Sequence, residues 1–199
     1  ASKIIGKLTP SGVWTWGTIF WSDTLGGMST DSDGNVFVTG SYGWVTNSVT
    51  FNSTFPGFAS SAQPDEMFVA KINHLGGLEW VSTASNPSTT GWVYPLSISI
   101  DRGGNSFVTG GFSTSVSFGN HTLTGNNGTQ DLLLAKINAD GEWVWATSAG
   151  DSTATYDTQG FDVYIQDDIA YIWIAWRGNL SLGDFEVPST SNPNQHHLI

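Results

Sequence analysis

The stretch AKINADGEWVWA, residues 135–146, occurs in two further, similar versions in this chain. Residues 70–81 read AKINHLGGLEWV, and residues 6–17 read GKLTPSGVWTWG. In each version a glycine follows the first lysine by five residues, and a tryptophan follows it by nine. These positions are Lys7, Lys71 and Lys136, then Gly12, Gly76 and Gly141, and finally Trp16, Trp80 and Trp145. A fixed register of this kind indicates an internal repeat.

The residues between these versions are patterned as short strands separated by turns. DSDGNVFVTG at residues 31–40 reappears as DRGGNSFVTG at residues 101–110. Asp-Gly and Gly-Asn pairs between alternating apolar runs favour β-hairpins, because Gly and Asn accept the positive φ that tight turns need. We therefore expect a single all-β domain, residues 1–199, built from repeated four-stranded antiparallel units. The predicted units are residues 7–70, 71–135 and 136–199, with residues 1–6 as an extra terminal strand.

Four-stranded units at a fixed interval are typical of β-propeller blades. Closed propellers use roughly four to eight blades, so three units predict an incomplete ring. SKIIGKL at the start and HHLI at the end both resemble the closing strand of a unit. Because an unpaired strand edge is a template for another chain, we expect self-association through the terminal strands, or pairing with neighbouring repeats of a longer chain. Head-to-tail contacts of this kind form a filament unless they close into a ring.

The composition excludes several classes of partner. The chain carries 17 acidic residues against six Lys and Arg, for a net charge of −11. Such a surface repels phosphate backbones, so we expect no nucleic-acid partner. No stretch approaches the roughly 20 apolar residues of a membrane helix, which predicts no membrane insertion. The absence of Cys excludes disulfides and thiolate chemistry.

No catalytic or metal-binding pattern stands out in the sequence. A nucleophile elbow of the form G-x-S-x-G is absent. Four histidines are present, at positions 74, 121, 196 and 197, and they lack the convergent spacing of a zinc site. We therefore predict a protein that is not an enzyme and has no cofactor and no metal. A propeller glycoside hydrolase, with two acids on different blades, is the third and weakest hypothesis.

The ten tryptophans fall into two groups. Those that recur in every unit are interpreted as packing residues, because a ligand contact has no reason to recur in each unit. Others lie near expected loops and are candidates for stacking on a sugar, which makes a carbohydrate-binding propeller segment the alternative function. These candidates are Trp44, Trp92 and Trp176. Candidate N-glycosylation sites, from N-x-S/T sequons, are Asn52, Asn120, Asn127 and Asn179.

The repeats resemble the SBBP, or seven-bladed β-propeller, repeat family of bacteria and archaea. The first unit carries the resemblance in DSDGNVFVTG, in Phe55-Pro56 and in DEMFVAKIN with GLEWVSTA. The second carries it in DRGGNSFVTG, DLLLAKIN and GEWVWATSAG, and the third only in spacing and apolar pattern. Such repeats are similar to parts of large secreted or surface-exposed proteins. The resemblance implies an extracellular or cell-surface location, and with the composition it predicts a structural or adhesive role in a surface assembly.

Overall fold

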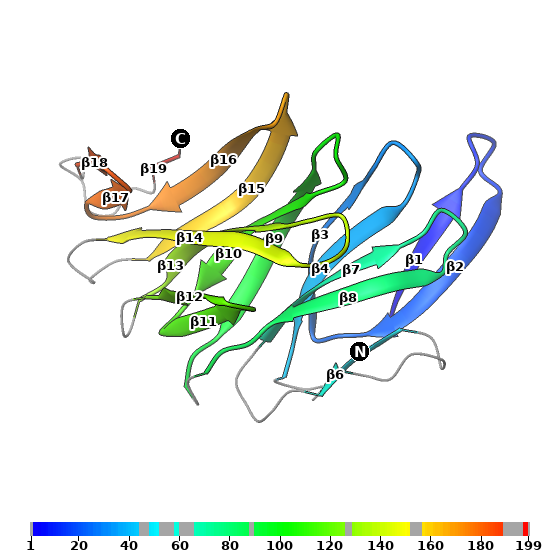
Figure 1. The fold of residues 1–199 in the computed structure, drawn as a ribbon, viewed down its shortest axis with the longest axis horizontal. Coiled ribbons are helices and arrows are strands. Elements are labelled where there is room, and N and C mark those ends of the chain that lie inside the picture. The colour runs from blue at the N-terminus through cyan, green and yellow to red at the C-terminus, as the bar shows by residue number, and fades with distance from the viewer. Residues whose placement is uncertain are drawn as a thin grey trace.

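The strands form antiparallel sheets that follow one another in chain order, from the N-terminal sheet at the right of Figure 1 to the C-terminal sheet at the left. The computed structural model describes residues 2–43, 48–51, 58–59, 66–87, 90–125, 129–151, 157–188 and 197–198. Within these ranges every regular element is a β-strand, which confirms the predicted all-β class.

Two complete four-stranded blades lie between two partial ones. The first sheet orders β1 (Ser2–Leu8), β2 (Trp14–Trp21), β5 (Ser48–Phe51) and β6 (Phe58–Ala59). The second orders β3 (Thr24–Thr30), β4 (Val36–Tyr42), β7 (Glu66–Ile72) and β8 (Leu78–Ala84). The third orders β9 (Val93–Ile100), β10 (Ser106–Phe112), β13 (Asp131–Ile137), β14 (Trp143–Asp151), β17 (Leu180–Leu182) and β18 (Phe185–Val187). The fourth orders β15 (Thr158–Gln166), β16 (Ile169–Trp176) and β19 (His197–Leu198).

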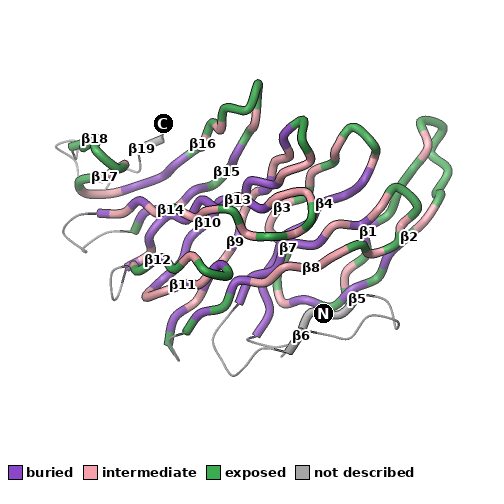
Figure 2. The backbone as a smooth tube through the Cα atoms, in the orientation of Figure 1, coloured by how far each residue is buried: buried purple, intermediate pink, exposed green. Residues whose placement is uncertain are grey.

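The core lies between successive sheets. β4 and β10 are buried along their whole length, because each is covered on both faces (Figure 2). Val36 and Val38 pack toward the first sheet, whereas Phe37 packs toward the third. This alternation follows from the two-residue period of a strand. The result is a row of stacked blades, as in an incomplete propeller.

The sheets are out of phase with the sequence units. β3 and β4 precede residue 70, whereas β8 follows it, and all of them belong to the second sheet. The third sheet likewise takes β9 and β10 from one unit and β14 from the next. Each complete blade is therefore closed by strands of the following unit, which ties consecutive units together.

Hairpins continue the outer edges of the blades. β5 and β6 pair onto β2, and β17 and β18 pair onto β14. The separate hairpin of β11 (Ser115–Phe118) and β12 (His121–Thr124) meets the chain after β8 through a bridge between Ser85 and Ser117. Each of the three hairpins covers the edge of one blade, and along the chain it directly follows the second strand of the blade after that one. The strand edges that propellers must protect are thus covered by the neighbouring blade.

The repeated segments DSDGN and DRGGN form the predicted turns. Asp101 Oδ1 accepts hydrogen bonds from the backbone N–H groups of Gly103 and Asn105, each at 2.9 Å. Asp31 holds the first turn in the same way. The third copy, which lacks the glycines, turns instead through Asp167 and Asp168, with φ of 50° and 63°. Asp tolerates this left-handed region better than most residues, so the hairpin persists.

Candidate functional site

The recurring tryptophans join each blade to the turn of the next. The indole N–H of Trp16 donates to the His74 carbonyl at 2.9 Å, and that of Trp80 donates to the Ala139 carbonyl at 3.0 Å. Two residues further on, Thr18 and Ser82 donate hydroxyl hydrogen bonds to the carbonyls of the turn glycines, Gly76 and Gly141. This confirms the structural reading of these tryptophans and shows that they pack between blades.

The turn glycines are required by this contact. Gly76 and Gly141 have φ of +90° and +88°, and a Cβ on either would lie 2.9 Å from Cδ2 of the indole above it. Any other residue would therefore be strained and would also displace the ring. Each such contact consists of one tryptophan, the Thr or Ser two positions later, and the glycine turn that both side chains cover. We call it a Trp–turn contact.

Half of a Trp–turn contact remains at each end of the row. Trp145 packs against Phe107, with ring centroids 6.0 Å apart, but within the described residues no turn covers it, and Thr147 beside it is exposed. At the other end, Gly12 has φ +81° and no heavy atom within 4 Å of a Cβ placed on it. One end thus presents a tryptophan without a turn, and the other a turn without a tryptophan.

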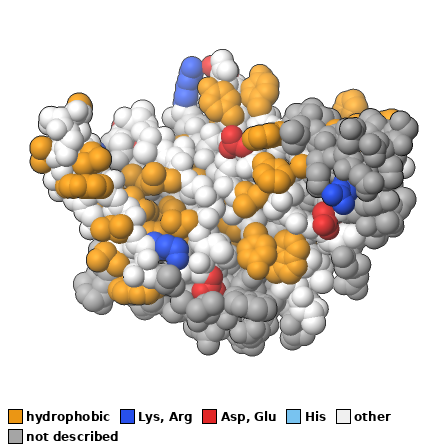
Figure 3. All heavy atoms as spheres, turned by 180° about the vertical axis from the view of Figure 1, so that it is seen from behind, with side chains coloured by type: hydrophobic (Ala, Val, Ile, Leu, Met, Phe, Trp, Pro, Cys, Tyr) orange, Lys and Arg blue, Asp and Glu red, His pale blue; other side chains and the backbone are white. Residues whose placement is uncertain are grey.

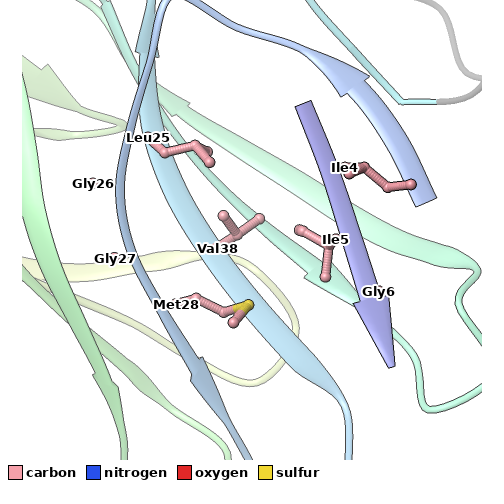
Figure 4. A pocket seen from close by; sticks show the side chains of 8 residues that line it. All are labelled: Ile4, Ile5, Gly6, Leu25, Gly26, Gly27, Met28 and Val38. Atoms are coloured by element: carbon pink, nitrogen blue, oxygen red, sulfur yellow. The ribbon is translucent and has the colours of Figure 1, made fainter. Parts of the chain in front are cut away.

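The N-terminal end presents an open apolar sheet face. Ile4 is 69% exposed and Trp14 is 68% exposed. Apolar side chains reach the surface over this sheet, at the left of Figure 3. A groove of about 230 Å³ beside β1 is lined by Ile4 together with Leu25 and Met28 of the second sheet (Figure 4). Among the described strands β1 pairs only with β2, so its other edge and this groove lie where two further strands would complete the first blade.

The C-terminal end presents a second apolar face. β15 and β16 bury one side against the third sheet through Val163 and Ile174. On the other side Tyr164, Tyr171 and Trp173 are between 48% and 58% exposed. β19 pairs only with Ala175 and Trp176 of β16. Within the described residues, the rest of that edge of β16 carries no strand.

The predicted stacking tryptophans lie in different surroundings. Trp44 is outside the described residues. Trp176 is only 4% exposed and belongs to the core between the third and fourth sheets, so its ring offers no face to a sugar. Trp92 is half-buried and stacks on Tyr94, with ring centroids 5.1 Å apart and an interplanar angle of 25°. It also lines a polar cavity of about 260 Å³.

Two of the four sequons can be placed. Asn120 is exposed in the turn between β11 and β12. Asn179 is exposed just before β17, and its backbone N–H donates to Asp151 at 3.1 Å. Asn52 and Asn127 lie outside the described residues. Both of these asparagines are exposed to solvent. Their glycosylation stays a prediction.

The repeated lysines lie over aromatic rings and beside acids. Lys136 Nζ lies 4.7 Å from the centroid of Phe107 and 3.5 Å from Asp101 Oδ2. Lys71 lies 5.6 Å from the centroid of Phe37 and forms an ion pair with Glu79 at 2.9 Å. Both lysines thus combine an ion pair with a cation–π contact.

Two buried ionisable groups have shifted pKa values. Burial of Asp101 disfavours its charge, but hydrogen bonds from Asn105 and Gly103 and the charge of Lys136 outweigh burial and lower its pKa below the ordinary 3.8. Burial raises the pKa of Tyr42 well above its ordinary value, and the neighbouring Glu66 raises it further. Tyr42 belongs to the core between the first and second sheets, and Asp101 to a turn of the third sheet, so these shifts follow from packing and from turn hydrogen bonds.

Over the described ranges, no group of three or more His, Asp or Glu side chains converges as metal ligands would. No helix in those ranges has the length and apolar character needed to cross a membrane.

Comparison with known proteins agrees with the sheet architecture. No protein-family model matches the chain. An uncharacterized WD repeat-containing protein of Acanthamoeba polyphaga mimivirus is 24% identical over 186 residues, covering 78% of this chain and 13% of the viral protein. WD repeats form four-stranded propeller blades. Together with the stacked antiparallel sheets, this likeness fits a β-propeller-type repeat. The narrower resemblance to the SBBP family stays a prediction.

Proposed function

We propose that this propeller-type repeat is a non-catalytic structural module that associates head to tail with further copies of itself. The observation that carries the proposal is the pair of half-contacts, Trp145 with Thr147 at one end and the Gly12 turn at the other. The same two halves are joined twice inside the chain, at Trp16 with Gly76 and at Trp80 with Gly141. A second copy therefore supplies each end with a surface of the kind already packed between its blades.

The strand edges match in the same way. Tyr42, Phe112 and Trp176 end β4, β10 and β16, and the residues five positions earlier are Phe37, Phe107 and Tyr171. Phe37 and Phe107 pair with Lys71 and Lys136 on the next strand. Adding β1 of another copy to β16 in this register places Lys7 opposite Tyr171. That pairing repeats the cation–π contact of the two complete blades.

The side chains of the two ends are also compatible. In the proposed register the exposed face of β16, with Tyr171 and Trp173, turns toward the second sheet of the other copy. That sheet exposes 62% of Met28 and 45% of Leu25 along the groove of Figure 4. Aromatic rings and Met contact each other favourably, and removing these surfaces from water favours association. In this register Ile4–Leu8 lie opposite Ala170–Ile174, whereas Ser2 and Lys3 compete with β19 for Ala175 and Trp176.

The number of blades per copy indicates whether the head-to-tail contacts can close into a ring. Each copy supplies two complete blades, and its two end sheets combine with those of its neighbours into one more. Two copies would make about six blades, within the range of roughly four to eight that closed propellers use. If the rotation does not close, the same contact continues as a filament. Both forms use the contact that we propose.

Three glycine and tryptophan variants test this proposal by light scattering over a concentration series. The unassociated chain has a mass of 21.3 kDa, so assembly gives about 43 kDa or more at high concentration. Gly12→Ala and Trp145→Ala should both reduce association strongly. Gly183→Ala is the matched control, since Gly183 also has a positive φ, +59°, and open space around it, but lies in the β17–β18 turn. A wild-type chain that stays at 21.3 kDa at every concentration would refute the proposal.

An extracellular or cell-surface location is part of the same proposal. It is supported by the acidic composition and by the exposure of Asn120 and Asn179 at the surface of the blades. Peptide mapping of the protein from its native host tests it. Glycan on either asparagine supports export, and unmodified asparagines in a protein recovered only from inside the cell would contradict it.

A further inference from the structure

The β11–β12 hairpin and the outer strand β8 together hold a tryptophan of the next blade. Trp143 of β14 donates its indole N–H to the Thr83 carbonyl of β8 at 3.0 Å. Its ring packs edge-on against Phe118, with ring centroids 4.8 Å apart and an interplanar angle of 74°. The ring also lies beside the hairpin turn, because a Cβ on Gly119 would be 3.8 Å from Cδ1 of Trp143. We call an outer strand with its hairpin a hairpin site.

The β17–β18 hairpin on β14 forms a second hairpin site. The first hairpin is bridged to its outer strand through Ser117 and Ser85, and the second through Ser181 and Gly150. The glycine after the first hairpin strand has φ of +57° in one site and +59° in the other. Corresponding residues of the two sites are Ser117 and Ser181, Phe118 and Leu182, Gly119 and Gly183, and Thr83 and Ser148. The two sites therefore share their pairing and their turn geometry.

The second hairpin site holds no tryptophan within the described residues. No heavy atom lies within 4 Å of a Cβ placed on Gly183. Phe185 of β18 is 76% exposed, more than any other large apolar side chain of the described ranges. The first site is filled from the outer strand of the next sheet, and the fourth sheet, as far as it is described, has no such strand. The missing tryptophan must therefore come from elsewhere.

Trp14 is the copy of Trp143 at the other end of the row. It pairs with Leu8 just after a β-bulge, as Trp143 pairs with Ile137 just after a β-bulge. Ile137 is fully buried against the preceding blade, whereas Leu8 is 48% exposed and Trp14 is 68% exposed. Trp14 thus belongs to a contact surface that the described residues leave uncovered.

The sequence matches tryptophans to glycines at these positions. SVTF at residues 48–51 is followed by Asn52, whereas the corresponding strands of the other two hairpins are followed by Gly119 and Gly183. In the blade after the Asn52 hairpin, the residue at the tryptophan position is Leu78. In the blade after the Gly119 hairpin it is Trp143. By this pattern the Gly183 hairpin requires a tryptophan.

We propose that Trp14 of one copy occupies the hairpin site of β14, β17 and β18 on another copy. The inference rests on the proposed head-to-tail association and adds a second anchor, separate from the Trp–turn contact. The indole N–H of Trp14 then donates to the Ser148 carbonyl, and its ring covers Leu182 and Gly183. β2 and β17 lie at opposite ends of the row, as such a contact requires (Figure 1). Buried tryptophans are among the strongest anchors of protein interfaces.

Disulfide trapping tests the contact directly. A Cβ on Gly119 would lie 3.9 Å from Cβ of Trp143, within the roughly 3.5–4.5 Å that a disulfide spans. The chain has no Cys, so introduced thiols find no native partner. A Trp14→Cys chain is mixed with a Gly183→Cys chain and oxidised, at a concentration at which light scattering shows that the mixture assembles. Intact mass should show a covalent dimer that contains one chain of each kind.

Controls separate this contact from the proposed function. A single chain with Trp143→Cys and Gly119→Cys should form the disulfide internally. Asp33→Cys replaces Gly183→Cys in the negative control, because Asp33 is exposed in a turn outside the proposed contact. Assembly with no more mixed dimer than in this control would overturn the Trp14 contact alone. A wild-type chain that never assembles would overturn both proposals.

Trp14→Ala measures what the contact contributes. The dissociation constant of assembly should rise about tenfold or more, because a large ring is lost from the interface. Urea unfolding below the assembly concentration should change little, since Trp14 is mostly exposed in the single copy. Leu75→Ala is the matched control, because Leu75 is 73% exposed in the β7–β8 turn and takes no part in either contact between copies. Assembly of Trp14→Ala at the wild-type concentration would overturn the proposal.

Discussion

At the scale of single residues, Trp80 shows how one side chain joins two blades. Its ring packs edge-on against Phe37, with centroids 5.9 Å apart, and covers Gly141 of the next blade. Its indole N–H is satisfied by the Ala139 carbonyl. The repeated tryptophan therefore contacts two blades at once, and Trp145 is the copy for which the described residues supply only the Phe107 side of that contact.

Trp80→Ala should lower the free energy of unfolding by about 3–5 kcal/mol, because it opens a cavity between two blades and leaves the turn carbonyl without its donor. Trp145→Ala removes the same side chain where no turn covers it within the described residues, so its cost in the monomer should be clearly smaller. Urea unfolding of both variants at a concentration below assembly checks this. Equal losses would show that the turn contact adds nothing.

Asp101 predicts a pH dependence. Its pKa is lowered in the fold, so its contribution to stability is present above the ordinary pKa of 3.8 and is lost as the pH falls through the lower folded value. Asp101→Asn should lower the free energy of unfolding by about 1–2 kcal/mol at pH 7. The difference from wild type should shrink by pH 3. Urea unfolding at both values measures it, with the exposed Asp33→Asn as the control; a difference that stays constant would contradict the prediction.

At the scale of elements, the hairpins decide how the outer strands are protected. The Ser117 N–H donates to the Ser85 carbonyl at 2.8 Å, and the Ser85 N–H donates to the Ser117 carbonyl at 3.1 Å. These two bonds hold the β11–β12 hairpin to the chain that leaves β8. The contact is short, so it should open more readily than the pairing of β10 with β13.

Ser117→Pro removes one of the two donors and should free the end of β8. Hydrogen exchange of the Ser85 amide should accelerate, whereas amides in β10 and β13 should keep their protection. The free energy of unfolding should fall by about 1–2 kcal/mol. Ser117→Ala keeps the backbone N–H and serves as the control. Equal exchange at Ser85 in the two variants would show that the hairpin does not depend on this bridge.

At the scale of the whole molecule, each described sheet packs on its neighbours in the row. Three separate hydrophobic clusters lie between the first and second, second and third, and third and fourth sheets. Stability in such a row is approximately a sum of neighbour contacts. A two-stranded ribbon is only marginally stable by itself, so β1 and β2 depend on the cluster that contains Ile5 and Phe20.

Phe20→Ala should therefore loosen one end of the molecule. Phe20 is fully buried and packs edge-on against Phe68, with ring centroids 6.3 Å apart, so the change should cost about 3–5 kcal/mol in that contact. Hydrogen exchange should rise in β1 and β2 while β13 and β14 remain protected. A uniform rise through the whole chain would mean that the row unfolds as one unit.

Local sequence predicted the turns well, but it did not predict which side chains the neighbouring sheets bury. Asp101 with Gly104 identified a hairpin because turn chemistry acts over four or five residues. The Asp167-Asp168 turn carries no glycine signal, so its place followed only from alignment with the other two copies. Trp176 ends β16 next to a loop, as expected, but its ring is buried because the third sheet packs over it from elsewhere in the chain.

The sequence by itself determined that the chain is all-β and repetitive and that the recurrent tryptophans pack, because strand period, turn residues and spacing are properties of neighbours along the chain. Only the tertiary structure decided which surface each tryptophan covers, which hairpin protects which edge, and that Trp92 shares a cavity with Thr129 and Gln130. These relations join residues from different blades. They arise when sheets stack, and no local pattern encodes which distant backbone will lie opposite a given side chain.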